Sequence, residues 1–366
     1  MTPSLPPVLA DRYDALLLVS FGGPERTDDV IPFLENVLRG KNVPRERTLE
    51  VAEHHYSFGG KSPINEQNRA LIAALERELN AQGPAMPIYW GNRNWRPMLA
   101  DTLGRMRADG IRRALAFATS AFGSYSGCRQ YREDIERARV EIGSGAPEIH
   151  KLRTYHDHPG FVQAMADRVR DALSRIPDER RAAAPLLFTA HSIPISMAET
   201  SPYVAQLLES CRLVSQAVGR PGALVYQSRS GPPMQPWLEP DVCDSIRRLH
   251  AHGALTDLVL APIGFLSDHM EVVYDLDTEA AALCRELGVN LARAATVGVH
   301  PAFVSMIREL ILERTDGRER RCLGTENAGC DTCGPACCPP PQAGGGQIRG
   351  GTVTTRARAP VFPAPR

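Results

Sequence analysis

The sequence predicts an α/β protein with two Rossmann-like, doubly wound lobes, each built on a parallel sheet. Short apolar runs typical of buried strands alternate with longer helical segments, and this alternation occurs twice along the 366-residue chain. The chemistry of such sheets lies beyond the carboxyl ends of the strands, so we expect a functional site in a cleft between the lobes. We predict lobes at residues 12–150 and 151–315, a cysteine-rich segment at 316–338 and a disordered tail at 339–366.

Six runs are short and apolar enough to form buried strands, and most are followed by turn residues. They cover residues 16–21, 88–91, 114–119, 186–190, 223–227 and 258–264. The expected helices repeat apolar residues at the spacing of one helical face. They cover residues 65–82, 131–138, 160–175, 203–218, 241–252, 271–287 and 301–314.

Composition excludes several classes of protein. Lys+Arg and Asp+Glu both number 42, whereas a protein that binds nucleic acid through bulk charge has a basic excess. The longest strongly apolar stretches, 15–21 and 258–266, are far shorter than the ~20 residues of a membrane helix. The first residues lack the pattern of a secretory signal. We therefore expect a cytoplasmic protein with no nucleic-acid partner and no integral membrane segment.

Two polar motifs follow predicted strands. His191-Ser192-Ile193-Pro194 places a histidine at a strand end, where it is either a catalytic group or a packed or solvated residue. Residues 262–271 lead into a helix that carries Glu271, Asp275 and Glu279 at i, i+4 and i+8 of one face. Such a row is either a solvated acidic face or a path for cations or protons.

Trp237 follows another predicted strand and a proline-rich loop. A tryptophan is unfavourable in water, so this side chain either covers the core or forms one wall of a flat apolar pocket.

The cysteines indicate a metal site. Five of the nine lie within 17 residues, at positions 322, 330, 333, 337 and 338, which in a large cytosolic chain favours metal binding over disulfides. Cys330-x₂-Cys333-x₄-Cys338 supplies three thiolates, and Cys128 in a loop after a strand is a natural fourth. From these residues alone, zinc and [2Fe–2S] both fit.

Together, residues 191–194, residues 226–231 with Trp237, and residues 262–277 resemble the ferrochelatase family over residues 16–303. The resemblance implies insertion of Fe²⁺ into a porphyrin that lies between two Rossmann-like lobes, without redox change. It implies that His191 and Glu271 face each other across the porphyrin centre and bind the Fe²⁺ substrate. Asp275 and Glu279 would then form an acidic path behind Glu271.

The terminal cysteines resemble those of ferrochelatases with a [2Fe–2S] cluster, which implies the ligands Cys128, Cys330, Cys333 and Cys338, with Cys337 as a competitor of Cys338. With residues 92–95 and 120–131, the cluster pattern resembles the actinobacterial branch. That resemblance implies insertion of Fe²⁺ into coproporphyrin III to give coprohaem in haem b biosynthesis. It also implies transient contact with the next enzyme of the haem pathway.

The same resemblance places five residues around the porphyrin, namely Phe21, Arg39, Ser62, Tyr131 and Trp237. Phe21 stands where some members of the branch have an iron-ligating tyrosine, and phenylalanine has no ligating atom. The alternatives are a protoporphyrin IX ferrochelatase, a chelatase for another metal, and an iron–sulfur electron carrier. The last leaves His191, Glu271 and Trp237 without a role.

Overall fold

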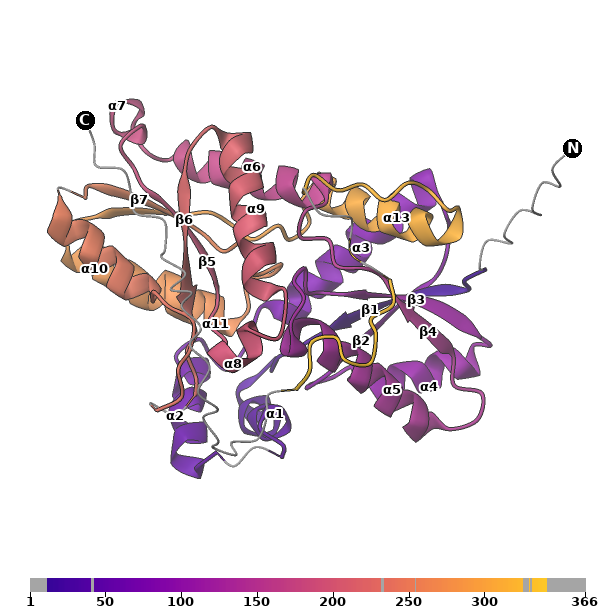
Figure 1. Ribbon diagram of the computed structural model, residues 1–366. Helices are drawn as coiled ribbons and strands as arrows, with labels where there is room; N and C mark the ends of the chain where they lie inside the picture. Colours follow the sequence, from indigo (N-terminus) through magenta and orange to yellow (C-terminus); the bar gives the residue numbers. More distant parts are fainter. Residues whose placement is uncertain are drawn as a thin grey trace, which may run out of the picture.

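Two four-stranded parallel sheets form the framework of the chain (Figure 1). The computed structural model describes residues 12–40, 43–231, 234–253, 255–324, 329 and 331–340. One sheet has the order β2-β1-β3-β4 and the other β6-β5-β7-β8, so the second repeats the topology of the first. The strands are β1 (Ala15–Ser20), β2 (Ile88–Asn92), β3 (Arg113–Ala118), β4 (Glu148–Lys151), β5 (Leu186–His191), β6 (Gly222–Gln227), β7 (Asp257–Ala261) and β8 (Asn290–Arg293). These sheets confirm the predicted α/β fold.

The central strands are apolar at nearly every position because helices cover both faces of each sheet. Every residue of β1 and of β7 is buried. β4 and β8 were not predicted, because these edge strands have only four residues each and contain polar side chains. They add to the sheets through parallel pairing with β3 and β7.

Helices form two outer layers and one shared central layer, as the buried clusters show. The outer helices are α4 (Leu99–Ala108) and α5 (Gln130–Ile142) on the first sheet, and α10 (Val242–His252), the π-helical segment η3 (Val273–Ala280) and α12 (Ala281–Glu286) on the second. The central helices are α3 (Ile64–Gln82), α6 (Pro159–Leu173), α9 (Tyr203–Val218) and α13 (Pro301–Thr315). The remaining segments are η1 (Thr27–Asp29), α1 (Val30–Val37), α2 (Arg45–Tyr56), the π-helical turn η2 (Tyr125–Arg129), α7 (Asp178–Arg181), α8 (Ile195–Ala198) and α11 (Met270–Val272).

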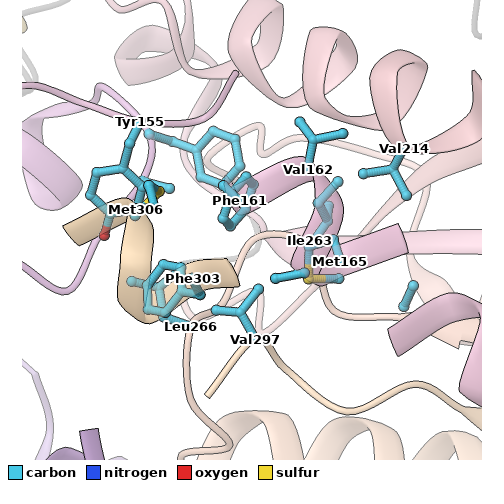
Figure 2. Packing of buried hydrophobic residues seen from close by; sticks show 14 of the residues in the cluster. Tyr155, Phe161, Val162, Met165, Val214, Ile263, Leu266, Val297, Phe303 and Met306 are labelled. Atoms are coloured by element: carbon cyan, nitrogen blue, oxygen red, sulfur yellow. The ribbon is translucent and has the colours of Figure 1, made fainter. Parts of the chain in front are cut away.

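One hydrophobic core joins the two sheets through the central helices. Figure 2 shows Phe161 of α6, Val214 of α9 and Phe303 of α13 in this buried cluster. Phe303 also packs on Phe117 of β3, with ring centroids 6.2 Å apart. The predicted division at residue 150 falls inside β4, and α13 packs against α3 of the preceding lobe. The domain boundaries therefore stay a prediction.

The segment expected as one α-helix over residues 271–287 differs from that expectation. It begins as α11, continues as the π-helical η3 and returns to α-helix in α12. A π-helix bonds each residue to the fifth along the chain, so its turn is wider, and such turns are frequent at functional sites.

Two other expectations concern the chain as a whole. Within the described ranges, no helix combines the length and apolarity needed to cross a membrane. Most of the predicted tail, residues 341–366, lies outside the residues that the structure describes.

Candidate active site

His191 is the last residue of β5, so the strand delivers its imidazole to the carboxyl edge of the second sheet. Its Nδ1 contacts the carbonyl oxygen of Ser192. A carbonyl can only accept, so this contact selects the tautomer that carries the proton on Nδ1. Nε2 then keeps its lone pair when the ring is neutral. The side chain is 31% exposed and a substrate can reach it.

Glu271 lies beside this imidazole, although it comes from α11 after β7. Its Oε2 is 3.5 Å from His191 Nε2 and 3.9 Å from Nδ1 of His269. The Glu271 side chain is 53% exposed. The structure thus brings together the two residues that the sequence analysis paired, and it adds His269 to them.

The charges of His191, Glu271 and His269 shift one another's pKa values. Burial alone lowers the pKa of His191, but the neighbouring Glu271 carboxylate outweighs burial and raises it above its ordinary value. Burial likewise acts to raise the pKa of Glu271, while the facing His191 and His269 lower it to about 2. His269 has a lowered pKa because burial disfavours its charged form. Glu271 is therefore a carboxylate at neutral pH, available to a cation.

Asp275 lies one turn further along η3, behind Glu271. Its Oδ2 accepts hydrogen bonds from the Ser228 hydroxyl and from Gln227 Nε2, the latter at 3.2 Å. Burial, with the charges of Glu271 and Glu279, raises the pKa of Asp275 to about 7. Glu279 is exposed, and burial with nearby Asp241 raises its pKa. The row thus runs from exposed Glu271 beside His191 through half-buried Asp275 to exposed Glu279.

Trp237 is half-buried beside the loop that follows His191. It forms an antiparallel bridge with Pro194, and Leu238 N donates to Ile193 O at 3.0 Å. Gly231 lies so close to the indole that a Cβ there would meet Trp237 Nε1 at 2.3 Å. The tryptophan loop therefore packs directly on the histidine loop.

Phe21 follows β1 at the carboxyl edge of the first sheet and is 36% exposed. The Arg93 guanidinium lies 5.9 Å from the centre of its ring and 4.6 Å from that of Tyr131. Arg93 also forms an ion pair with Asp134, in which both side chains are largely buried. The buried guanidinium of Arg93 thus packs against the ring of Phe21.

The other residues assigned to the porphyrin rim differ in accessibility. Arg39 is exposed just beyond α1. Ser62 is 3% exposed and its amide donates to Pro24 O at 2.8 Å. Tyr131 is 4% exposed, within the core between the first sheet and α5. Their roles at a porphyrin stay a prediction, and in this structure Tyr131 supports Arg93 rather than facing solvent.

Residues of the first lobe that the sequence analysis missed contact the loop and helix that carry Glu271. Gln67 of α3 accepts from Asp268 N at 2.9 Å, and the His54 ring stacks on Tyr274 with centroids 3.8 Å apart. His55 is 6% exposed, and burial lowers its pKa to about 4. The Glu271 carboxylate acts to raise this pKa but does not offset burial. No motif marks these residues, because tertiary packing alone brings them to the site.

Four of the five predicted cluster cysteines can be placed. Cys128, Cys333, Cys337 and Cys338 line one small cavity, together with Arg129, Arg132 and Lys151. Cys330 lies outside the described residues. A hydrogen bond with Cys333 lowers the pKa of the Cys128 thiol. Thiols from two distant segments and cations around them suit an anionic metal–thiolate group. In the described ranges, no group of three or more His, Cys, Asp or Glu side chains is arranged to hold a metal ion as it stands.

A histidine paired with a carboxylate at the edge of a two-sheet α/β fold, with an acidic row behind it, is the kind of arrangement that fits a metal-handling enzyme of the chelatase class. The sequence profile described as Ferrochelatase matches residues 13–315. The chain therefore belongs to the ferrochelatase family, and it is an enzyme that inserts iron into a porphyrin.

Relatives and one solved structure agree with this assignment. A protein named ferrochelatase from Rhodopirellula baltica is 58% identical, over 92% of this chain and 98% of its own length. A coproporphyrin III ferrochelatase of Streptomyces coelicolor is 51% identical, over 92% of this chain and 96% of its own. The structure of SirB from Bacillus subtilis with Fe³⁺ has a TM-score of 0.50 at 13% identity, covering 84% of this chain and 98% of that one, and it shares the fold alone.

Proposed function

We propose that this protein inserts Fe²⁺ into coproporphyrin III, giving coprohaem for haem b biosynthesis. The observation that supports this reaction is the distance of 3.5 Å between Glu271 Oε2 and His191 Nε2. It places a proton acceptor beside a metal-binding carboxylate, with an acidic row behind the carboxylate. The coproporphyrin III ferrochelatases of Streptomyces coelicolor and Nocardia farcinica, both 51% identical to this chain, support the choice of porphyrin. Protoporphyrin IX is the alternative substrate, since the Rhodopirellula baltica relative is named simply ferrochelatase.

The reaction replaces two pyrrole N–H protons with one Fe²⁺, so no electron moves and the two released protons balance the metal charge. His191 Nε2 takes a pyrrole proton, because the contact from Nδ1 to Ser192 O leaves the Nε2 lone pair available. Glu271 binds the incoming Fe²⁺ through oxygen, a ligand that releases iron to the ring more readily than thiolate does. Asp275 and Glu279 pass the ion to Glu271 from the surface.

The porphyrin lies between the lobes, with Phe21 and Trp237 as its apolar contacts. Both are partly exposed, and each follows a strand at a carboxyl edge. The exposed guanidinium of Arg39 forms an ion pair with a porphyrin propionate. Ser62 and Tyr131 are buried and support the residues that contact the edge of the porphyrin. The enzyme works in the cytoplasm and passes its product to the next haem-pathway enzyme by transient contact.

The cysteine cavity holds a [2Fe–2S] cluster through Cys128, Cys330, Cys333 and Cys338. The thiols of Cys128, Cys333 and Cys338 around one cavity support this ligand set. Cys337 is the competing ligand, because its Sγ lies 3.8 Å from that of Cys338. When bound, the cluster supplies one-electron redox chemistry. Metal insertion requires none, so the cluster has a structural or sensing role.

The decisive experiment is steady-state Fe²⁺ insertion with coproporphyrin III and protoporphyrin IX side by side, with loss of free porphyrin followed by its fluorescence. We expect a strong preference for coproporphyrin III, and no turnover by H191A with either. Preference for protoporphyrin IX would overturn the substrate proposal while leaving the chelatase intact. Cluster absorbance without insertion into either porphyrin would instead favour the iron–sulfur electron carrier.

A further inference from the structure

We propose that Arg293 is a positioning residue of the insertion reaction, which holds the segment that carries Glu271 in place. This inference rests on the proposed role of Glu271 in binding Fe²⁺, and it assigns a role to a side chain outside the pair of His191 and Glu271. Arg293 is the last residue of β8, which pairs with β7, and the loop after β7 leads to Glu271. The sheet therefore gives the arginine a fixed position beside that loop.

The guanidinium of Arg293 binds two carboxylates, one on each side of Glu271 in the sequence. Its Nη1 donates to Asp268 Oδ1 at 2.8 Å. Its Nε and Nη2 donate to Oδ1 and Oδ2 of Asp277 at 2.8 and 2.6 Å. Asp268 lies in the loop before α11, whereas Asp277 lies within η3. One planar guanidinium thus ties together two points of the chain between which Glu271 lies.

Burial makes these ion pairs more rigid than those of an ordinary surface arginine. Fully exposed pairs contribute little, because solvent screens the charges and the side chains move freely. The Arg293 side chain is only 17% exposed, and those of Asp268 and Asp277 are 21% and 37% exposed. The two parallel bonds to Asp277 also fix the orientation of its carboxylate as well as its distance. Arg293 therefore restrains the segment rather than merely lying near it.

The five carboxylates of residues 268–279 divide into two sets. Asp268 and Asp277 pair with Arg293, and no other arginine or lysine of the described residues forms an ion pair with any of the five. The second set is the acidic row, which consists of Glu271, Asp275 and Glu279. Like charges this close repel one another along a helix, and the guanidinium offsets that repulsion. It does so without occupying the carboxylates that are proposed to receive Fe²⁺.

The π-helical form of η3 makes an added restraint important. Only Leu276 and Ala280 of its eight residues are buried, so few side chains attach it to the core. A segment with so few buried contacts opens more readily than the sheet beside it. Without Arg293, Glu271 would be freer to move relative to His191. Insertion depends on that geometry, because a misplacement of about 1 Å can slow a reaction by about 100-fold.

The test is steady-state Fe²⁺ insertion by the full chain, with whichever of the two porphyrins it metallates faster. The kcat and the KM for Fe²⁺ are measured separately, and porphyrin affinity is measured by fluorescence quenching. We expect R293M to lower kcat/KM for Fe²⁺ by about 10-fold or more, the range for loss of outer support at a metal site, with porphyrin affinity unchanged. R293K should recover part of the loss, because an ammonium group replaces the charge but not the planar fork. R285M, at an exposed arginine of α12, is the matched control and should behave like the unaltered protein.

A second variant keeps the test decisive if R293M does not fold. D277N removes one partner of Arg293 at a side chain that is 37% exposed, and it should also lower kcat/KM for Fe²⁺, by less than R293M does. The double variant R293M/D277N should be no slower than R293M, because Asp277 acts through Arg293.

Several results would count against this role. Unaltered kcat and KM in R293M and D277N would overturn it, even if the urea midpoint of R293M were lowered, because Arg293 would then serve stability alone. An equal loss in R285M would show a general charge effect, and an equal loss of porphyrin affinity in R293M would show disruption of the whole cleft. E271Q separates the two proposals. Full activity of E271Q would overturn the role of Glu271 itself, whereas an inactive E271Q beside an unaltered R293M would overturn the role of Arg293 alone.

Discussion

His191 Nε2 and Glu271 Oε2 lie 3.5 Å apart at the carboxyl edge of the second sheet. β5 and β7 are neighbours in that sheet, so the residues that follow them meet although they are distant in sequence. The contact joins a base whose lone pair is oriented by Ser192 to a carboxylate that stays charged at neutral pH. The residue proposed to accept the pyrrole proton and the residue proposed to deliver the metal are therefore in direct contact.

Removing either partner should abolish insertion. We expect H191A to lose about 100-fold or more in insertion rate, the usual range for loss of a general base. We expect E271Q also to lose most of its activity, because a neutral amide binds Fe²⁺ more weakly than a carboxylate does. Porphyrin affinity, measured by fluorescence quenching, should change little, because neither side chain supplies the apolar contacts. H252A, on the exposed end of α10, is the control. Retained turnover in both variants would contradict the site.

The pKa of His191 should depend on Glu271. The carboxylate raises this pKa above the ordinary value for histidine, so the imidazole stays protonated to higher pH and becomes a base only above that point. We expect E271Q to lower it, because burial then acts without the opposing charge. An NMR titration of the histidine rings measures the shift, with exposed His252 as internal reference. An unchanged His191 titration in E271Q would refute the coupling.

Cation binding by the acidic row should weaken as the pH falls through about 7. Asp275 has its pKa raised to about 7, so it is neutral below that pH and negative above it. S228A removes a hydrogen bond that lowers this pKa, and the loss of affinity should then begin at higher pH. Mn²⁺ binding without porphyrin, followed from pH 6 to 8, tests both expectations. S174A removes an exposed hydroxyl just beyond the end of α6 and should behave like the unaltered protein. An affinity independent of pH would rule out this role of Asp275.

The sequence could predict the central strands, because burial on both faces makes nearly every residue apolar. It could not predict β4 or β8, since an edge strand of four partly polar residues carries no periodicity. α2 was missed for a related reason, because it buries only Ala52 and His55 and shows no apolar stripe. The π-helical form of η3 also leaves no composition signal, as α- and π-helix differ in which backbone groups pair.

The sequence singles out His191 because it follows a predicted strand end, and Trp237 because a tryptophan ends the loop after another strand; their roles at the site stay predictions. Gln227 ends β6 directly opposite His191, and its contact with Asp275 could have been inferred from that placement. Gln67 and His54 could not, since they reach the site from helices of the other lobe. For the cysteine cavity, the spacing of the cysteines in the sequence indicates the thiols. The cations around them could not be predicted, because they come from η2, α5 and β4, which are distant in sequence from the cysteine segment.

Replacing Phe21 with tyrosine should alter the product spectrum. Phe21 has no ligating atom, and its partly exposed ring lies over Arg93, a cation that favours a phenolate nearby. We expect F21Y, once its ferrous coprohaem product has been oxidised with ferricyanide, to show the visible bands of tyrosinate ligation. F21L, which also lacks an oxygen, should keep the spectrum of the unaltered protein. Identical spectra for F21Y and F21L would show that residue 21 does not face the iron.

The buried ion pair between Arg153 and Glu313 should contribute far more to stability than an exposed one. Arg153 Nε and Nη2 donate to the two carboxylate oxygens of Glu313 at 2.7 and 2.8 Å, and the side chains are 1% and 3% exposed. E313Q leaves the guanidinium buried without its counter-charge, which costs about 3–5 kcal/mol. D244N breaks the Arg247–Asp244 pair, whose side chains are 60% and 68% exposed, and should cost about 0.5 kcal/mol or less. Urea unfolding compares the two, and equal midpoints would mean that α13 is held to the segment after β4 by apolar packing alone.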